Sequence, residues 1–327
     1  MGKRHSPRFG SMQVWPRKRA KRPVARVRSW PKVKDAKPLG FPCYKAGMTH
    51  VMLTESRKTS HMKGERVRVP VTVLECPPVR MFGVRAYKHS GYGLAVSGEV
   101  WVKADKALAR RLDVGKVGDF SAIEALRTPE CVGLALLVHT QPRLTGIGKK
   151  TPEVLELRLG GSLDEQLAFI KDHLDRPITV QEVFAEGDLA DAHGVTRGKG
   201  YQGPVKRFGI GLRSHKSEKG RRGPGSIGTW IAQAHTSYRI AHAGQMGYHL
   251  RTQYNNQIMK IGEKPIEINP EGGFVGFGLV RGTYLLMRGS IQGPKKRIIT
   301  LTKPVRALVK PQHQAPEYIY KESQQGV

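Results

Sequence analysis

The sequence has few cysteines and no long apolar run. Its three cysteines, Cys43, Cys76 and Cys131, are far apart and form no C-x-x-C pair. This argues against a conventional zinc site and against a disulfide framework, so we expect small buried or half-buried thiols. No run of about 18 apolar residues occurs, so no segment is expected to span a membrane. The N-terminus is basic but lacks the apolar core of a secretory signal.

Hydrophobic residues are also scarce. They make up 39% of the 327 residues, below the roughly 45–50% typical of globular chains. A chain of this length can still form one large domain or two with a proper core. We therefore expect part of the chain to lie outside any core.

Acidic residues are nearly absent from two segments. Residues 1–38 hold 13 Lys/Arg and one acid, and residues 193–262 hold 12 Lys/Arg and one acid. In contrast, residues 39–192 hold 21 basic and 19 acidic residues, and residues 263–327 hold 10 and 5. The net charge of +30 therefore lies mainly in two blocks. Such blocks resist compaction unless a polyanion neutralises them, and nucleic acid is the obvious candidate.

Residues 1–38 resemble an extended arm, because a proline recurs every seven to nine residues: Pro7, Pro16, Pro23, Pro31 and Pro38. An isolated arm of this composition should be disordered in water. A solvated tail, a nuclear-import signal or a membrane-surface segment are alternatives, although Pro and Gly interrupt any amphipathic helix. The interleaved aromatics Phe9, Trp15 and Trp30 favour RNA, since aromatic rings stack on bases.

From Phe41 onward the sequence consists of short β-like runs separated by Gly and Pro. These runs predict a mainly β, α+β body of the barrel or sandwich type. The expected strands are 49–54, 66–76, 79–87, 94–102, 132–140, 154–159, 266–268, 282–288 and 297–302. Helices are expected over 120–126 and 162–174, the latter because Ser162 and Glu165 form a capping box. Residues 39–192 and 263–311 would form one body, from which 193–262 projects, and 312–327 would be a tail.

Glycine is dense in the projecting segment, with nine between His193 and Gly225. The run Gly198–Gly203 matches G-x-G-x-x-G, but Pro204 follows at once and no amphipathic helix is expected, so a dinucleotide site is not indicated. Glycines here would let a phosphate approach the backbone closely. Strand patterning resumes near 258–261.

Five histidines, His193, His215, His235, His242 and His249, cluster in the same segment. Only one acid, Glu218, accompanies them, which disfavours a metal site and offers nothing to orient a catalytic histidine. Stacking or phosphate contact is the favoured interpretation. An exposed Trp230 side chain in a Gly-rich loop is energetically unfavourable, so we expect it to contact a binding partner. The alternative is that Trp230 packs back on the body of the protein.

The Arg17–Arg19 arm and Trp230 after Ser-Ile-Gly-Thr resemble the archaeal and eukaryotic branch of the universal large-subunit ribosomal protein three family, the archaeal members above all, and four blocks of residues resemble the family as a whole. They are Tyr44–His50, Gly194–Gly200, Gly223–Gly228 and Ala243–Gly247, in that order. The resemblance covers essentially the whole chain. It implies a translation-factor-like β-barrel with an irregular basic extension that enters ribosomal RNA.

The resemblance also implies direct binding to large-subunit rRNA, an early role in subunit assembly, and a central loop near the peptidyl transferase centre without catalysis. The chain would then be a cytoplasmic ribosomal component and not an enzyme, with neighbouring ribosomal proteins as partners. No cofactor, membrane, small-molecule substrate or homo-oligomer is expected, apart from structural Mg²⁺ or K⁺ shared with rRNA. Bacterial members carry a modified Gln after Ser-Ile-Gly; Thr229 stands there, so that modification is not carried over.

The candidate rRNA-binding side chains are the cations, aromatics and polar residues of the two basic blocks: Arg17, Lys18, Arg19, Lys21, Arg22, Arg26, Arg28, Trp15, Trp30, Arg197, Lys199, Lys206, Arg207, Arg213, His215, Lys216, Arg221, Arg222, Trp230, His235, Arg239, His242, Gln245, His249 and Arg251. The candidate glycines for phosphate approach are Gly198, Gly200, Gly203, Gly223, Gly225, Gly228, Gly244 and Gly247. Two rival functions remain open. An RNA-modifying enzyme would need a cofactor fingerprint, and a DNA-packaging protein would not explain the barrel-like body.

Overall fold

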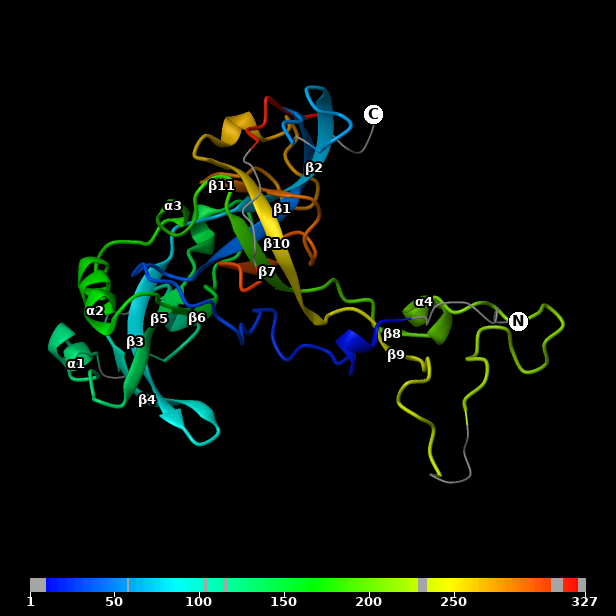
Figure 1. Cartoon of the computed structure of the whole chain (residues 1–327), viewed down its shortest axis with the longest axis horizontal. Helices are drawn as coiled ribbons and strands as arrows, with labels where there is room; N and C mark the ends of the chain where they lie inside the picture. Colours follow the sequence, from blue (N-terminus) through cyan, green and yellow to red (C-terminus); the bar gives the residue numbers. More distant parts are fainter. Residues whose placement is uncertain are drawn as a thin grey trace. The chain divides into compact units, whose positions relative to one another are not determined.

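The computed structural model describes residues 10–57, 59–102, 105–113, 117–228, 234–306 and 314–322. The chain divides into two compact units. The extension unit comprises Met1–Arg22 and Val195–Arg251, and the barrel unit comprises Pro23–Gly194 and Thr252–Val327. Within the described residues, the barrel unit is built mainly from strands, which confirms the mainly β prediction (Figure 1).

The larger sheet closes on itself. Its strand order is β12-β7-β10-β11-β2-β1-β13, and β12 also pairs with β1. The strands are β1 (Gly40–Thr54), β2 (Arg66–Glu75), β7 (Leu189–Val195), β10 (Leu250–Gly262), β11 (Tyr284–Arg288), β12 (Ile298–Thr302) and β13 (Tyr318–Ile319). The additional β12–β1 pairing makes this sheet a barrel, so β1 has no free edge where β12 and β2 flank it.

Strand β1 is long enough to pair with three strands, one of which is β2, from Tyr44 opposite Glu75 to Thr54 opposite Arg66. Its first residues pair antiparallel with β12, from Gly40 opposite Thr302 to Tyr44 opposite Ile298. Further along, Val51 and Met52 pair with β13. The 314–322 part of the C-terminal segment therefore docks on β1 within the barrel unit.

Alternation in β2 explains how the barrel fills its interior. Val69, Val71 and Val73 are at most 6% exposed, whereas Arg66 and Arg68 are exposed. Because side chains of a strand alternate between the two faces, this pattern places the valines inside the barrel. Toward its end, β2 is buried on both faces, as expected of a strand covered from both sides.

A second sheet has the order β4-β3-β5-β6. It contains β3 (Arg80–Ser90), β4 (Gly93–Trp101), β5 (Cys131–His139) and β6 (Val154–Arg158). Helix α2 (Leu163–Asp172) carries the predicted capping box and bonds to this sheet, because the Gln166 side chain accepts the Leu134 amide at 2.9 Å. Short helices α1 (Phe120–Glu124) and α3 (Val180–Val183) complete the unit, with 3₁₀ turns η2 (Leu108–Arg110), η3 (Pro142–Leu144) and η4 (Pro265–Glu267).

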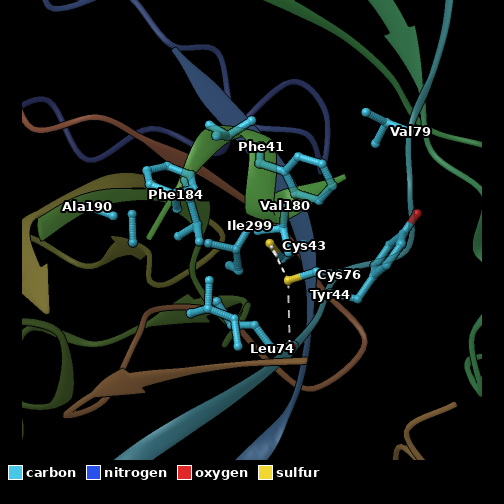
Figure 2. Packing of buried hydrophobic residues seen from close by; sticks show 14 of the residues in the cluster. Phe41, Cys43, Tyr44, Leu74, Cys76, Val79, Val180, Phe184, Ala190 and Ile299 are labelled. Carbon is cyan, nitrogen blue, oxygen red and sulfur yellow. Dashed lines mark hydrogen bonds between the residues drawn. The ribbon is translucent and has the colours of Figure 1, made fainter. Parts of the chain in front are cut away.

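The core joins the barrel to α3, and it contains two cysteines that face each other (Figure 2). The Sγ atoms of Cys43 and Cys76 lie 2.9 Å apart, although 33 residues separate them in sequence. All three cysteines are free and buried, as predicted. Distance along the sequence did not reveal that two of them meet, because antiparallel pairing of β1 and β2 places them opposite each other.

Two expectations about strands need correction. Residues 266–268 form part of the 3₁₀ turn η4 and the residue after it, because Pro265 supplies a fixed φ and no amide donor at its start. Strand β7 was not predicted, since Leu189–Val195 offers small residues where β-branched ones are expected. No helix among the described residues is long and apolar enough to cross a membrane.

Candidate nucleic-acid interface

The extension unit contains little regular structure. It has the 3₁₀ turn η1 (Met12–Val14), the helix α4 (Pro204–Phe208) and the two-residue strands β8 (Tyr201–Gln202) and β9 (Gly244–Gln245), which pair antiparallel. Helix α4 corrects the expectation that none begins at Pro204. Proline at the first position suits a helix start, and Gly209, with φ +71°, ends the helix after five residues.

The N-terminal arm is part of this unit. The Trp15 indole stacks on the Phe208 ring with centroids 5.6 Å apart, and the Arg17 guanidinium lies 4.3 Å from the centre of the same ring. Arg17 also donates to the Arg207 carbonyl at 2.9 Å. The arm and the central segment, about 190 residues apart, therefore contribute to one aromatic and cationic cluster.

Backbone contacts extend this attachment along the arm. The Ala20 amide donates to the Tyr248 carbonyl at 2.8 Å, and the ring of His249 bonds to the Lys18 carbonyl through Nδ1 at 2.8 Å. The Arg19 guanidinium lies 5.3 Å from the centre of the Tyr248 ring. Burial lowers the pKa of His249, which favours a neutral ring whose Nδ1–H donates to the Lys18 carbonyl.

Arg207 is committed to holding the unit together. Its Nε donates to the Gln245 carbonyl at 3.0 Å and its Nη1 to the His242 carbonyl at 2.9 Å. Burial lowers the pKa of this guanidinium, although arginine remains charged in proteins. The same fork thus joins α4 to the segment around β9, a role that its position in a basic run did not reveal.

Gly247 has a role within the protein that differs from the expected one. Its φ is +71°, and a Cβ at this position would lie 2.0 Å from the Arg197 carbonyl oxygen. The close approach at Gly247 is therefore to the chain's own backbone. In contrast, a Cβ at Gly200, Gly203 or Gly225 would meet no atom within 4 Å, so those glycines leave open space beside the backbone.

Most of the predicted cations are exposed. The exposed candidates are Lys18, Arg19, Lys21, Arg22, Arg26, Arg28, Arg197, Lys199, Lys206, Arg213, His215, Lys216, Arg221, Arg222, His235 and Arg239. Arg213 and Arg221 also donate to backbone carbonyls of Pro224 and Arg213. These side chains present positive charge to solvent, while their contact with RNA stays a prediction.

The remaining candidates are partly or fully buried. Trp15, Arg17, Arg207, His242, Gln245 and Arg251 are half-buried in the extension unit, and His249 is buried there. Trp30 packs against the hydrophobic core of the barrel unit. Trp230 and Thr229 lie outside the residues that the structure describes, and so does Phe9.

His193 is a component of the barrel rather than a phosphate-facing group. It is 7% exposed, and its ring nitrogens bond to the hydroxyls of Thr252 and Thr302, each at 3.0 Å. Burial lowers its pKa, so the neutral ring is favoured. Its position in β7 separates it from the other histidines, and the sequence did not reveal this because β7 was not predicted.

Two features bear on the metal and dinucleotide sites considered from the sequence. No group of three or more His, Cys, Asp or Glu side chains among them could hold a metal ion. The G-x-G-x-x-G letters contain strand β8, which pairs with β9 in a small antiparallel ribbon, and helix α4 after them has only five residues. A dinucleotide site needs a parallel strand before the glycines and a full helix after them, and strand β7 before them is antiparallel to β12.

Comparison with known proteins agrees with this arrangement. The family model for ribosomal protein L3 matches residues 1–326. The large ribosomal subunit protein uL3 of Methanococcus vannielii is 43% identical over 332 residues, covering 99% of both chains. The uL3 protein of Methanothermobacter thermautotrophicus is 43% identical over the whole of both chains. The uL3 protein of Archaeoglobus fulgidus is 44% identical over 93% of both chains.

These matches span the barrel and the extension alike, at identities that leave no ambiguity about descent, and the relatives named are archaeal. They confirm the resemblance found in the four sequence blocks. The chain belongs to the ribosomal protein L3 family and is a structural, non-enzymatic protein of the large ribosomal subunit.

Proposed function

We propose that the chain binds large-subunit rRNA directly, mainly through the extension unit. One observation supports this more than any other. The extension unit holds 19 Lys/Arg against one acid, whereas the barrel unit holds 37 against 25. A unit with so little apolar core and so much charge of one sign is stabilised when phosphates replace its counterions.

The contacts within the extension unit suggest that its polar and charged residues fall into two sets with different roles. Arg17 and His249 attach the arm to the central segment, and the Arg207 side chain joins α4 to the segment around β9. In contrast, cations such as Lys199 and Lys206 are exposed. The first group would give the interface its shape, and the second would neutralise phosphates. The open backbone at Gly200, Gly203 and Gly225 would let a phosphate reach the chain.

The finer functional assignments follow the family. The protein would act early in assembly of the large subunit, and its central loop would approach the peptidyl transferase centre without performing chemistry. Its partners would be rRNA and neighbouring large-subunit proteins in the cytoplasm, with no membrane, small-molecule substrate or second copy of itself. It would need no cofactor beyond Mg²⁺ or K⁺ ions shared with rRNA.

Ultraviolet crosslinking of native large subunits, with peptide-level mass mapping, tests this proposal. We expect crosslinks to rRNA from residues 10–22 and 195–251. Absence of rRNA crosslinks from both segments would contradict the proposal. Recombinant protein provides a second test: the variant K199Q/K206Q/K216Q should bind transcribed large-subunit rRNA more weakly and with a smaller salt dependence than the parent.

A further inference from the structure

The barrel unit carries a basic pocket outside both basic blocks of the sequence. This open pocket has a volume of about 410 Å³. Its cationic lining residues are Arg110, Arg143, Lys149, Lys150 and Arg281, and no acidic residue lines it. Four of these five belong to residues 39–192, whose overall charge is nearly balanced, so counting charges along the sequence does not reveal the pocket.

Most of these cations have no partner of opposite charge. Lys149 forms an ion pair with Glu153. Arg110, Arg143 and Lys150 are exposed, and none of the three forms a salt bridge with any residue in the described part of the chain. Arg281 is also exposed, and its charge interacts with the buried carboxylate of Glu75. Like charges gathered around one hollow repel each other, and an anion bound there would relieve the repulsion.

A buried carboxylate joins the two loops that carry the pocket. Glu75 is 0% exposed, and its Oε1 accepts the amides of Arg281 and Gly282 at 2.7 and 3.2 Å. It also accepts the amide of Gly146, from the loop that leads to Lys149 and Lys150. The end of β2 thus holds both loops from within the barrel unit.

Close backbone packing reinforces this attachment. A Cβ at Gly146 would lie 2.3 Å from the Leu279 carbonyl oxygen, so the two loops meet backbone to backbone. Gly148 has a φ of +75° and lines the pocket without adding a side chain. Lys149, Lys150 and Arg281 therefore lie on two loops that are held together by backbone contacts.

We propose that this pocket binds a backbone phosphate of large-subunit rRNA, and that the barrel unit thereby makes a polyanion contact of its own. Arginine forks match phosphate oxygens, and lysines add point charges to them. The identity of the polyanion rests on the proposed rRNA-binding function. The location of the pocket, its positive charge and the hydrogen bonds of Glu75 to its loops are observed in the structure and do not depend on that proposed function.

Two variants of equal charge test the proposal. The pocket variant is R143Q/K150Q/R281Q, and the control is K63Q/K264Q/K321Q, whose exposed lysines lie on the same unit outside the pocket lining. Binding to transcribed large-subunit rRNA is measured over a range of salt concentrations. Circular dichroism confirms that each variant is folded.

We expect the slope of log affinity against log salt to fall by about 2 to 3 in the pocket variant, since each lost phosphate contact removes about 0.7–1. The control should change it by less than about 1. Hydroxyl-radical footprinting should show one stretch of rRNA backbone that loses protection in the pocket variant and keeps it in the control.

Equal slopes and equal footprints for pocket variant and control would overturn the inference. If K199Q/K206Q/K216Q still weakens binding in that case, the proposed function survives and only the inference fails. A parent protein that does not bind rRNA overturns both. Crosslinks from Lys149 and Lys150 to a neighbouring protein instead of rRNA, in native subunits, would also overturn the inference.

Discussion

Trp15 and Phe208 form a stacked aromatic pair, with an interplanar angle of 26° and centroids 5.6 Å apart. One ring comes from the N-terminal arm and the other from the end of helix α4. Tyr238 adds an edge contact to Trp15 at 6.0 Å. This pair is the apolar part of an otherwise cationic unit, so the attachment of the arm should depend on it.

A double-mutant cycle on Trp15→Ala and Phe208→Ala tests that dependence. We expect a coupling energy of about 0.5–1.5 kcal/mol, as for other aromatic pairs. Hydrogen exchange at the Ala20 amide reports the opening, because this amide bonds to the Tyr248 carbonyl. A matched cycle of Trp15→Ala with Tyr201→Ala should show no coupling, because Tyr201 is 77% exposed. Equal coupling in both cycles would contradict a specific role for the stack.

Arg207→Lys keeps the charge but removes the planar fork that reaches two carbonyls. We expect faster hydrogen exchange around β9 and weaker rRNA binding, with an unchanged salt slope. Lys206→Gln is the matched control, because Lys206 is exposed and adjacent in sequence. It should lower the salt slope by about 1 without loosening the unit. The reverse pattern would show that Arg207 serves chiefly as a phosphate contact.

Gly247→Ala should disturb the approach of its segment to Arg197. The new Cβ would meet the Arg197 carbonyl oxygen, and alanine at a φ of +71° costs about 1–2 kcal/mol by itself. Exchange should accelerate at the Lys199 amide, which bonds to the Met246 carbonyl. Gly225→Ala, where a Cβ meets nothing within 4 Å, is the control and should leave exchange unchanged. Similar behaviour of the two variants would refute the steric explanation.

His193 should make barrel stability depend on pH. Burial holds its folded pKa below the unfolded value of about 6.5. The unfolded state therefore binds the proton more readily, and stability should fall as pH drops below about 6.5, down through the folded pKa. His193→Gln should flatten this part of the stability curve in chemical denaturation, whereas His215→Gln, at an exposed position, should not. Parallel curves for parent and His193→Gln would refute the prediction.

The sequence was most informative where one local signal sufficed. The β-like run over 66–76 predicted β2, and Ser162 with Glu165 predicted the start of α2. Charge separation identified the two basic segments, and most of their candidate cations are exposed, although Arg17, Arg207 and Arg251 are half-buried. The compact units divide the chain at Arg22 and Val195, and the domain boundaries drawn from charge stay a prediction.

Features made by distant residues were not predictable in this way. Nothing local to Cys43 indicates that Cys76 lies opposite it, since the register of β1 and β2 decides that. The cluster of Trp15, Arg17 and Phe208 and the pocket around Lys150 likewise depend on segments more than a hundred residues apart. Such contacts follow from topology, which one sequence does not specify by periodicity alone.

The pairing of β1 with β12 has a consequence for synthesis on the ribosome. The barrel can close only when β12 has been synthesised, because Gly40 pairs with Thr302. Closure therefore requires a contact that spans most of the chain. Both basic segments emerge earlier, since residues 1–38 and 193–262 precede β12. A nascent chain thus displays its cations before its core is complete, and is exposed to aggregation and stray polyanions until the last strands arrive.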